Sequence, residues 1–80
     1  MHLRSNTVIP EFLSAVRHCS ADVYFETKEG DCLNLKSVLS QYILCTLVSE
    51  PALLASGSIR LSNRSDMEYL TDYLEGNDDN

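Results

Sequence analysis

The chain has few basic residues, and this scarcity sets the first limit on its function. Six Lys and Arg stand against twelve Asp and Glu in 80 residues, so the formal net charge at pH 7 is −6. Binding to a phosphate backbone needs clustered Lys and Arg. The six basic residues are instead scattered: Arg4, Arg17, Lys28, Lys36, Arg60 and Arg64. We therefore expect no nucleic-acid partner.

Long apolar segments and paired cysteines are also missing. No run approaches the roughly 20 apolar residues that span a bilayer, and residues 1–12 lack the apolar core of a secretory signal. We expect no membrane partner and a cytoplasmic location. Cys19, Cys32 and Cys45 show no C-x-x-C spacing, which predicts reduced, mostly buried thiols. The same spacing disfavours a zinc site with His18, and we expect no metal and no cofactor.

The length and composition fit one domain over residues 1–80, with residues 1–7 and 77–80 flexible at its ends. Hydrophobic residues make up 44% of the chain and charged residues 22%, which is ordinary for a soluble domain. A core of this size seldom yields more than about 3–5 kcal/mol of net stability. A partner or a second copy would therefore help the fold.

The first half of the chain changes from helical to strand periodicity. Apolar residues at helical spacing predict a helix over Pro10–Cys19. Alternating residues predict a half-buried strand over Val23–Thr27 and a return strand over Cys32–Leu35. The charged turn at Lys28–Asp31 is short, so the two strands should form an antiparallel hairpin.

A second amphipathic helix should follow the hairpin. Ser37 is well placed as its N-cap, because the hydroxyl can accept a hydrogen bond from the first turn. The helix should cover Val38–Val48 and end before Pro51. We expect its wide apolar face to pack on the core. The residues on that face are Val38, Leu39, Tyr42, Ile43 and Leu47.

The remaining segments complete an α-β-β-α-β-α order. Pro51–Gly57 is expected to be a connection, and Ser58–Leu61 a short strand. The S-x-x-E pattern at Ser65–Glu68 predicts a capping box that opens a last helix, which Gly76 ends. Half-buried antiparallel strands need one covered face, so this order predicts an α+β two-layer sandwich.

Three segments of the chain resemble one known family. They are V-Y-F-E-T-K-E-G at Val23–Gly30, L-K-S at Leu35–Ser37 and I-R-L-S at Ile59–Ser62. Together with the element order, they resemble HPr, the histidine-containing phosphocarrier of the bacterial sugar phosphotransferase system. The resemblance covers about residues 8–76 and implies an HPr-like open-faced sandwich. Such a fold has an antiparallel sheet, here of three or four strands, with three helices on one face.

The family's reactive histidine is not at the expected place. Its active loop reads roughly G-[LI]-H-[AT]-R-P before the first helix, and the His position falls at Asn6 or Thr7 here. His2 and Arg4 match H-x-R, but five residues separate Arg4 from Pro10. We therefore expect no catalytic residue and a chain that is not an enzyme.

The resemblance also implies a docking surface and a regulatory serine. In the family, the face around the middle helix, here Ser37, Gln41 and Tyr42, and the entrance of the first helix bind partner proteins. The serine that opens this helix, here Ser37, is a phosphorylation site in many HPr proteins. Our first hypothesis is an HPr-like protein-interaction or regulatory module. The alternative is a phosphoacceptor modified at Ser37 or His2, and an unrelated toxin-like or stress-associated role is a third.

The family's first strand is largely missing from the chain. Its loss would leave the edge of Ser58–Leu61 uncovered, and an open edge invites pairing. Residues 1–6, a second copy or a partner could cover it, and we expect a homodimer through this edge.

Residues 33–42 also resemble short proteins that sometimes carry a poly(A) polymerase label. A nucleotidyltransferase needs paired metal-binding carboxylates and a nucleotide pocket. A chain of 80 residues is too short to frame both, so we do not adopt that activity.

Overall fold

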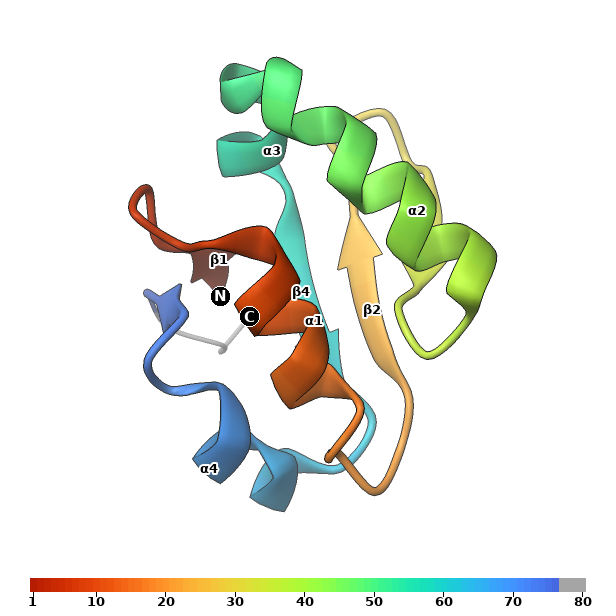
Figure 1. Ribbon diagram of the computed structural model, residues 1–80, viewed down its shortest axis with the longest axis vertical. Coiled ribbons are helices and arrows are strands. Elements are labelled where there is room, and N and C mark those ends of the chain that lie inside the picture. Colours follow the sequence, from red (N-terminus) through yellow and green to blue (C-terminus); the bar gives the residue numbers. More distant parts are fainter. Residues whose placement is uncertain (77–80) are drawn as a thin grey trace.

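The chain alternates short helices and strands along residues 1–76, the part that the computed structural model describes (Figure 1). The α-helices of this described part are α1 (Ile9–Val16), α2 (Val38–Thr46), α3 (Pro51–Ser56) and α4 (Met67–Leu70). The strands are β1 (His2–Leu3), β2 (Val23–Glu26), β3 (Cys32–Asn34), β4 (Ser58–Leu61) and β5 (Leu74–Glu75). Single 3-10 turns follow α2 at Leu47–Ser49 and precede α4 at Arg64–Asp66. The expected flexible segment 77–80 lies outside the described residues.

Two antiparallel sheets make up the β part of this α+β fold. The larger sheet has the order β3-β2-β4, and the smaller one pairs β1 with β5. Phe25 on β2 lies opposite Leu33 and Ile59 on its two neighbours. Val23 and Phe25 are fully buried, whereas Tyr24 and Glu26 are only half-buried. The predicted hairpin and its alternation are therefore confirmed.

The core lies between the larger sheet and α1. Four residues of α1, namely Ile9, Phe12, Leu13 and Val16, are buried, and each such side chain contributes about 1.5–3 kcal/mol on burial. In contrast, α2 contributes one buried residue, Leu44. The other buried apolar residues are Leu3, Cys19, Val23, Phe25, Leu35, Ile59, Leu70 and Leu74. Thus α1, and not α2, supplies most of the helical cover.

The middle of the chain contains a helix that the sequence pattern did not predict. The segment Pro51–Gly57, expected to be a connection, forms α3 over Pro51–Ser56. Pro51 occupies the first helical position, where its missing N–H costs nothing and its fixed φ favours the helix. The proline that ends one helix therefore also begins the next. The expected count of three helices was wrong.

The C-terminal region also differs from its prediction. The last helix does not continue to Gly76, because α4 ends at Leu70 and Leu74–Glu75 forms β5. Leu74 lies opposite Leu3 of β1, and both are buried. The pairing with β1 holds Leu74–Glu75 in an extended conformation. The predicted capping box is wrong too, since the Asn63 side chain accepts the hydrogen bond from the Ser65 N–H.

The first residues of the chain lie against the outer edge of β4. The Met1 carbonyl accepts a hydrogen bond from the Ile59 N–H at 2.7 Å. The His2 ring nitrogen Nδ1 lies 2.7 Å from the carbonyl oxygen of Gly57. Residues 1–7 were expected to be flexible, and residues 2–3 instead form β1. The chain's own N-terminus therefore covers part of the edge at which a homodimer was expected.

A buried carboxylate joins the loop between α1 and β2 to the 3-10 turn that precedes α4. Asp66 is 3% exposed and accepts hydrogen bonds from the Ser20 N–H at 2.9 Å and the Ala21 N–H at 3.1 Å. The Ser20 hydroxyl also donates to it. The hydrogen bond from the Ser20 N–H is the main cause that lowers the pKa of Asp66 below its ordinary value.

Replacing this carboxylate should make the fold less stable in a pH-dependent way. In Asp66→Asn the amide nitrogen cannot accept the hydrogen bond from the Ala21 N–H, so we expect a lower free energy of unfolding at pH 7. The folded-state pKa lies below the unfolded value of about 3.9. The carboxylate's contribution is therefore present above about pH 4 and is lost as the pH falls through the lowered pKa.

Urea denaturation of both proteins between pH 7 and pH 3 measures this effect. The difference between wild type and Asp66→Asn should narrow below about pH 4. The exposed Asp22 provides a control, because Asp22→Asn should change the midpoint little. A constant difference over the whole pH range would contradict the role given to Asp66.

Candidate functional site

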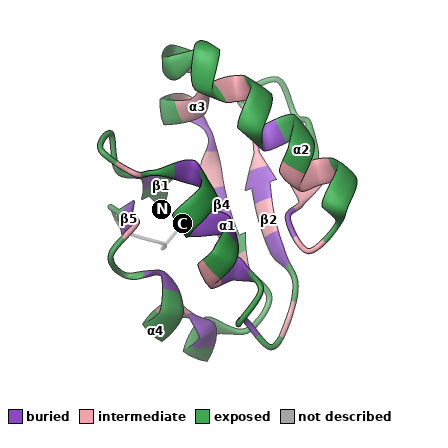
Figure 2. Ribbon diagram, in the orientation of Figure 1, coloured by how far each residue is buried: buried purple, intermediate pink, exposed green. Residues whose placement is uncertain are grey.

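Four large apolar side chains on α2 face solvent. Val38 is 80% exposed, Leu39 69%, Tyr42 69% and Ile43 36%. Figure 2 shows most of α2 in the exposed colour. We call these four residues the α2 face. Their predicted packing on the core was wrong.

The helix turns its more polar side toward the protein. Leu44 is its buried residue, and Ser40, Gln41 and Leu47, which share that side, are half-buried. The Gln41 side-chain N–H donates to the Leu35 carbonyl at 2.9 Å, which ties α2 to the end of the hairpin. The exposed large apolar residues of the helix are spaced one and four positions apart, so they share its opposite, outer side. They are Val38, Leu39, Tyr42 and Ile43. This orientation leaves the α2 face without cover.

A contiguous apolar surface of this kind is a common sign of a binding site. Single exposed apolar residues are normal on soluble proteins, but groups of neighbouring large ones mark contact surfaces. The stretch from Ser37 to Ser49 contains no charged residue, although the chain has 18 in total. The α2 face is therefore both apolar and uncharged, which suits contact with another apolar surface.

The three site residues predicted from the sequence lie in different environments. Ser37 is exposed and has extended backbone just before α2, but its side chain makes no capping hydrogen bond, contrary to expectation. Gln41 points inward to Leu35, while Tyr42 belongs to the α2 face. Sequence reasoning assigned the rest of that face to the core. One signal of this exposure was present in the sequence. Apolar residues occur on every side of this helix, whereas a helix with one buried face needs them on one side only.

The loop before α1 is held by hydrogen bonds to the C-terminal part of the chain. The Thr7 hydroxyl donates to the Tyr73 carbonyl at 3.0 Å, and the Arg4 N–H donates to the same oxygen at 2.8 Å. The Thr7 N–H donates to the Arg4 carbonyl. His2 lies in β1 with its ring on Gly57. Within residues 1–76, the structure therefore places no imidazole at the start of α1.

A small pocket of about 100 Å³ lies at the entrance of the first helix. It separates the loop before α1 from α3, and apolar side chains such as Leu3, Ile9 and Leu54 line it. Arg4 and Pro51 also contribute to its wall. Its volume would accept one small apolar group. The pocket thus lies at the entrance of the first helix, which the sequence analysis gave as the second docking region.

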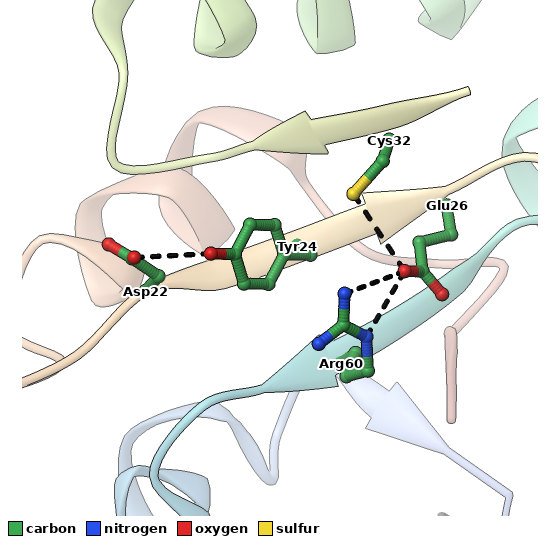
Figure 3. Close-up of polar contacts among 5 residues, drawn as sticks. All are labelled: Asp22, Tyr24, Glu26, Cys32 and Arg60. Atoms are coloured by element: carbon green, nitrogen blue, oxygen red, sulfur yellow. Dashed lines mark hydrogen bonds and ion pairs between the residues drawn. The ribbon is translucent and has the colours of Figure 1, made fainter.

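The open face of the larger sheet carries polar residues that bind one another (Figure 3). Arg60 forms an ion pair with Glu26 at 2.8 Å, and its guanidinium lies 4.6 Å from the centre of the Tyr24 ring. The Tyr24 hydroxyl donates to Asp22. The hydrogen bond from Arg60 lowers the pKa of Glu26. Exposed pairs like this one contribute little to stability, because water and salt screen them, so we assign the group to strand pairing.

The cysteines differ from the prediction of mostly buried thiols. Cys19 is buried, and burial is the main cause that raises its pKa. Cys32 lies exposed on the open sheet face, where its thiol donates to Glu26. Cys45 is exposed on α2. All three are free thiols.

Comparisons with models of protein families, with curated proteins and with solved structures found no match to this chain. The resemblance to HPr therefore stays a hypothesis based on sequence segments and element order. Within residues 1–76, no helix is long and apolar enough to cross a membrane. The same residues include no group of three His, Cys, Asp or Glu side chains arranged to hold a metal ion.

The orientation of α2 can be tested by comparing substitutions on its two sides. Leu39→Ser should change the free energy of unfolding by no more than about 0.5 kcal/mol, because the side chain is already in water. Leu44→Ala should cost about 2–5 kcal/mol, because it removes a fully buried side chain. Urea denaturation at low protein concentration measures both. Equal losses for the two variants would show that α2 packs differently.

Proposed function

We propose that the chain is a non-enzymatic protein-interaction module that binds a partner protein through the α2 face. The observation that carries this proposal is the solvent exposure of Val38, Leu39, Tyr42 and Ile43 on one side of a helix. A chain of this size has few apolar residues to spare, because its core is already small. Leaving four of them in water is costly unless a partner covers them.

The arrangement of elements supports an HPr-like framework for this module. The sheet order β3-β2-β4, with Met1 bonded to the outer edge of β4, fits a family sheet whose first strand is shortened. Both α1 and α2 contribute to one core with the sheet. The proposed module uses the surface around the middle helix, the docking region of the family it resembles. It lacks the phosphocarrier histidine, since Asn6 and Thr7 occupy the corresponding place.

A negative charge in the α2 face should abolish partner binding. We propose to immobilise the wild-type chain, Leu39→Glu and Tyr69→Glu, and to quantify the proteins that each retains from an extract of the source cells. Tyr69 is 45% exposed on α4, so its variant adds the same charge at an apolar surface residue elsewhere. Partners of the α2 face should be depleted at least about tenfold on Leu39→Glu, because a buried unpaired charge is costly.

The control separates a specific contact from a general effect of charge. Proteins retained equally by wild type and Tyr69→Glu but lost on Leu39→Glu would support the proposal. If all three chains retain the same proteins in the same amounts, the α2 face is not the docking surface. Matching urea midpoints for the three chains would exclude loss of folding as the cause.

One observation favours a second candidate function, phosphorylation at Ser37. Its hydroxyl is exposed and makes no capping hydrogen bond, so it is accessible to a kinase. A phosphate there would lie before the first turn of α2, near backbone N–H groups and the positive end of the helix dipole. It would also add about −1.5 to −2 charges beside the exposed Val38. Phosphorylation would then weaken docking on the α2 face.

Incubation with ATP and a kinase that modifies HPr on serine tests this candidate. Intact mass spectrometry should show one added phosphate on the wild-type chain and on His2→Ala, and none on Ser37→Ala. The His2→Ala variant is the control for the alternative phosphoacceptor. An unmodified wild-type chain under conditions that fully modify HPr would argue against this candidate.

A further inference from the structure

We infer that the pocket at the entrance of the first helix binds a branched apolar group of about four carbons that carries a carboxylate. The lining residues of this pocket come from the segments 3–9 and 51–55, so the site is separate from the α2 face. The inference therefore goes beyond the proposed function and is tested independently of it. The volume of the pocket and the charge at its wall support this ligand.

The apolar walls of the pocket belong to packed elements of the fold. Leu3 lies on β1, Ile9 begins α1, and Leu54 lies on α3. Leu3 and Ile9 are buried members of the core, and Leu54 packs against that core. The elements β1 and α3 are in contact, and Figure 1 shows them near the loop that enters α1. Both sides of the pocket are therefore fixed before a ligand arrives.

The volume of the pocket sets the size of the apolar group. A cavity of about 150 Å³ lined by Leu, Ile and Phe accepts benzene, which has six carbons. This pocket measures about 100 Å³. By proportion it accepts about four carbons, which is the size of an isobutyl group. Contact with the apolar walls would remove surface of both the ligand and the pocket from water.

The wall of the pocket carries a positive charge in an acidic chain. Residues 1–10 and 51–59, which include all the lining residues, contain Arg4 as their one side chain that is formally charged at pH 7. Arg4 is exposed, and no Asp or Glu within residues 1–76 forms an ion pair with it. Its N–H donates to the Tyr73 carbonyl at 2.8 Å, which fixes its backbone at the wall. A guanidinium binds a carboxylate through two parallel hydrogen bonds.

The two features together define a short branched carboxylic acid such as isovalerate. Its isobutyl group would fill the apolar part of the pocket, and its carboxylate would remain at the mouth beside Arg4. Ligand pockets generally combine apolar walls with a few polar groups that fix the orientation of the ligand. A peptide that ends in leucine offers the same isobutyl group and a carboxylate. The experiment therefore compares both sources.

An NMR titration of the isotopically labelled chain with isovalerate tests the inference. The amide signals of Leu3, Ile9 and Leu54 should shift to saturation, with a dissociation constant in the millimolar range expected for so small a ligand. Acetate lacks the isobutyl group, and isoamyl alcohol lacks the carboxylate. Both should bind at least about threefold more weakly. An acetylated tripeptide that ends in leucine provides the second source of the ligand.

Two arginine variants separate Arg4 from a general effect of charge. Arg4→Gln should raise the dissociation constant of isovalerate about three- to tenfold, because a charge-assisted contact is lost. Arg17 is also exposed but does not line the pocket. Arg17→Gln removes the same charge elsewhere and should leave the dissociation constant unchanged. Both positions are exposed, so both variants should fold.

The outcomes are decisive for the pocket and independent of the α2 face. Saturable shifts at the lining residues that weaken in Arg4→Gln alone support the inference. Tighter binding of the tripeptide than of isovalerate then assigns the ligand to the end of a chain, and weaker binding assigns it to a free acid. Shifts that do not saturate or that centre on other residues overturn the inference, as does equal affinity for isoamyl alcohol. Leu39→Glu should bind isovalerate like the wild type, so failure of one proposal leaves the other standing.

Discussion

The area over one face of a three-stranded sheet limits how many apolar side chains this chain can bury. Four residues of α1 take most of the helical share, and Leu44 is the one residue of α2 that reaches the core. The remaining apolar residues of α2 have no inner surface to cover. Burial stabilises a protein in proportion to the apolar area removed from water. These residues of α2 can therefore contribute stability only when a second surface covers them. The functional proposals follow from this surplus.

The sequence predicted the parts of the fold that local patterns determine. Period-two alternation and a short charged turn identified the hairpin, and Val23 and Phe25 are buried as that pattern requires. The paired β1 and β5 had no local signal, since Leu3 and Leu74 come from opposite ends of the chain. Helix α3 was missed because Pro51 was interpreted as a helix end, although proline is equally suited to a first turn.

The candidate site was predicted by place but not by orientation. The region around Ser37 and Tyr42 was identified, while the side of α2 that faces water was not. Periodicity cannot choose between two sides when both carry apolar residues. The choice came from contacts outside the helix: the Gln41 side chain donates to the Leu35 carbonyl, and Leu44 fills the core. These contacts turn Leu39 outward, and the hydrophobic periodicity of α2 does not reveal them.

The position of Met1 makes the N-terminus an unsuitable place for a fused segment. The Met1 carbonyl accepts a hydrogen bond from Ile59 and the His2 ring lies against Gly57, so the first residues of the chain lie beside the outer edge of β4. Any residues attached ahead of Met1 would begin at this edge. An affinity tag or fluorescent label joined there would lie against the larger sheet. It could extend the short strand β1 or pull β1 away from its partners.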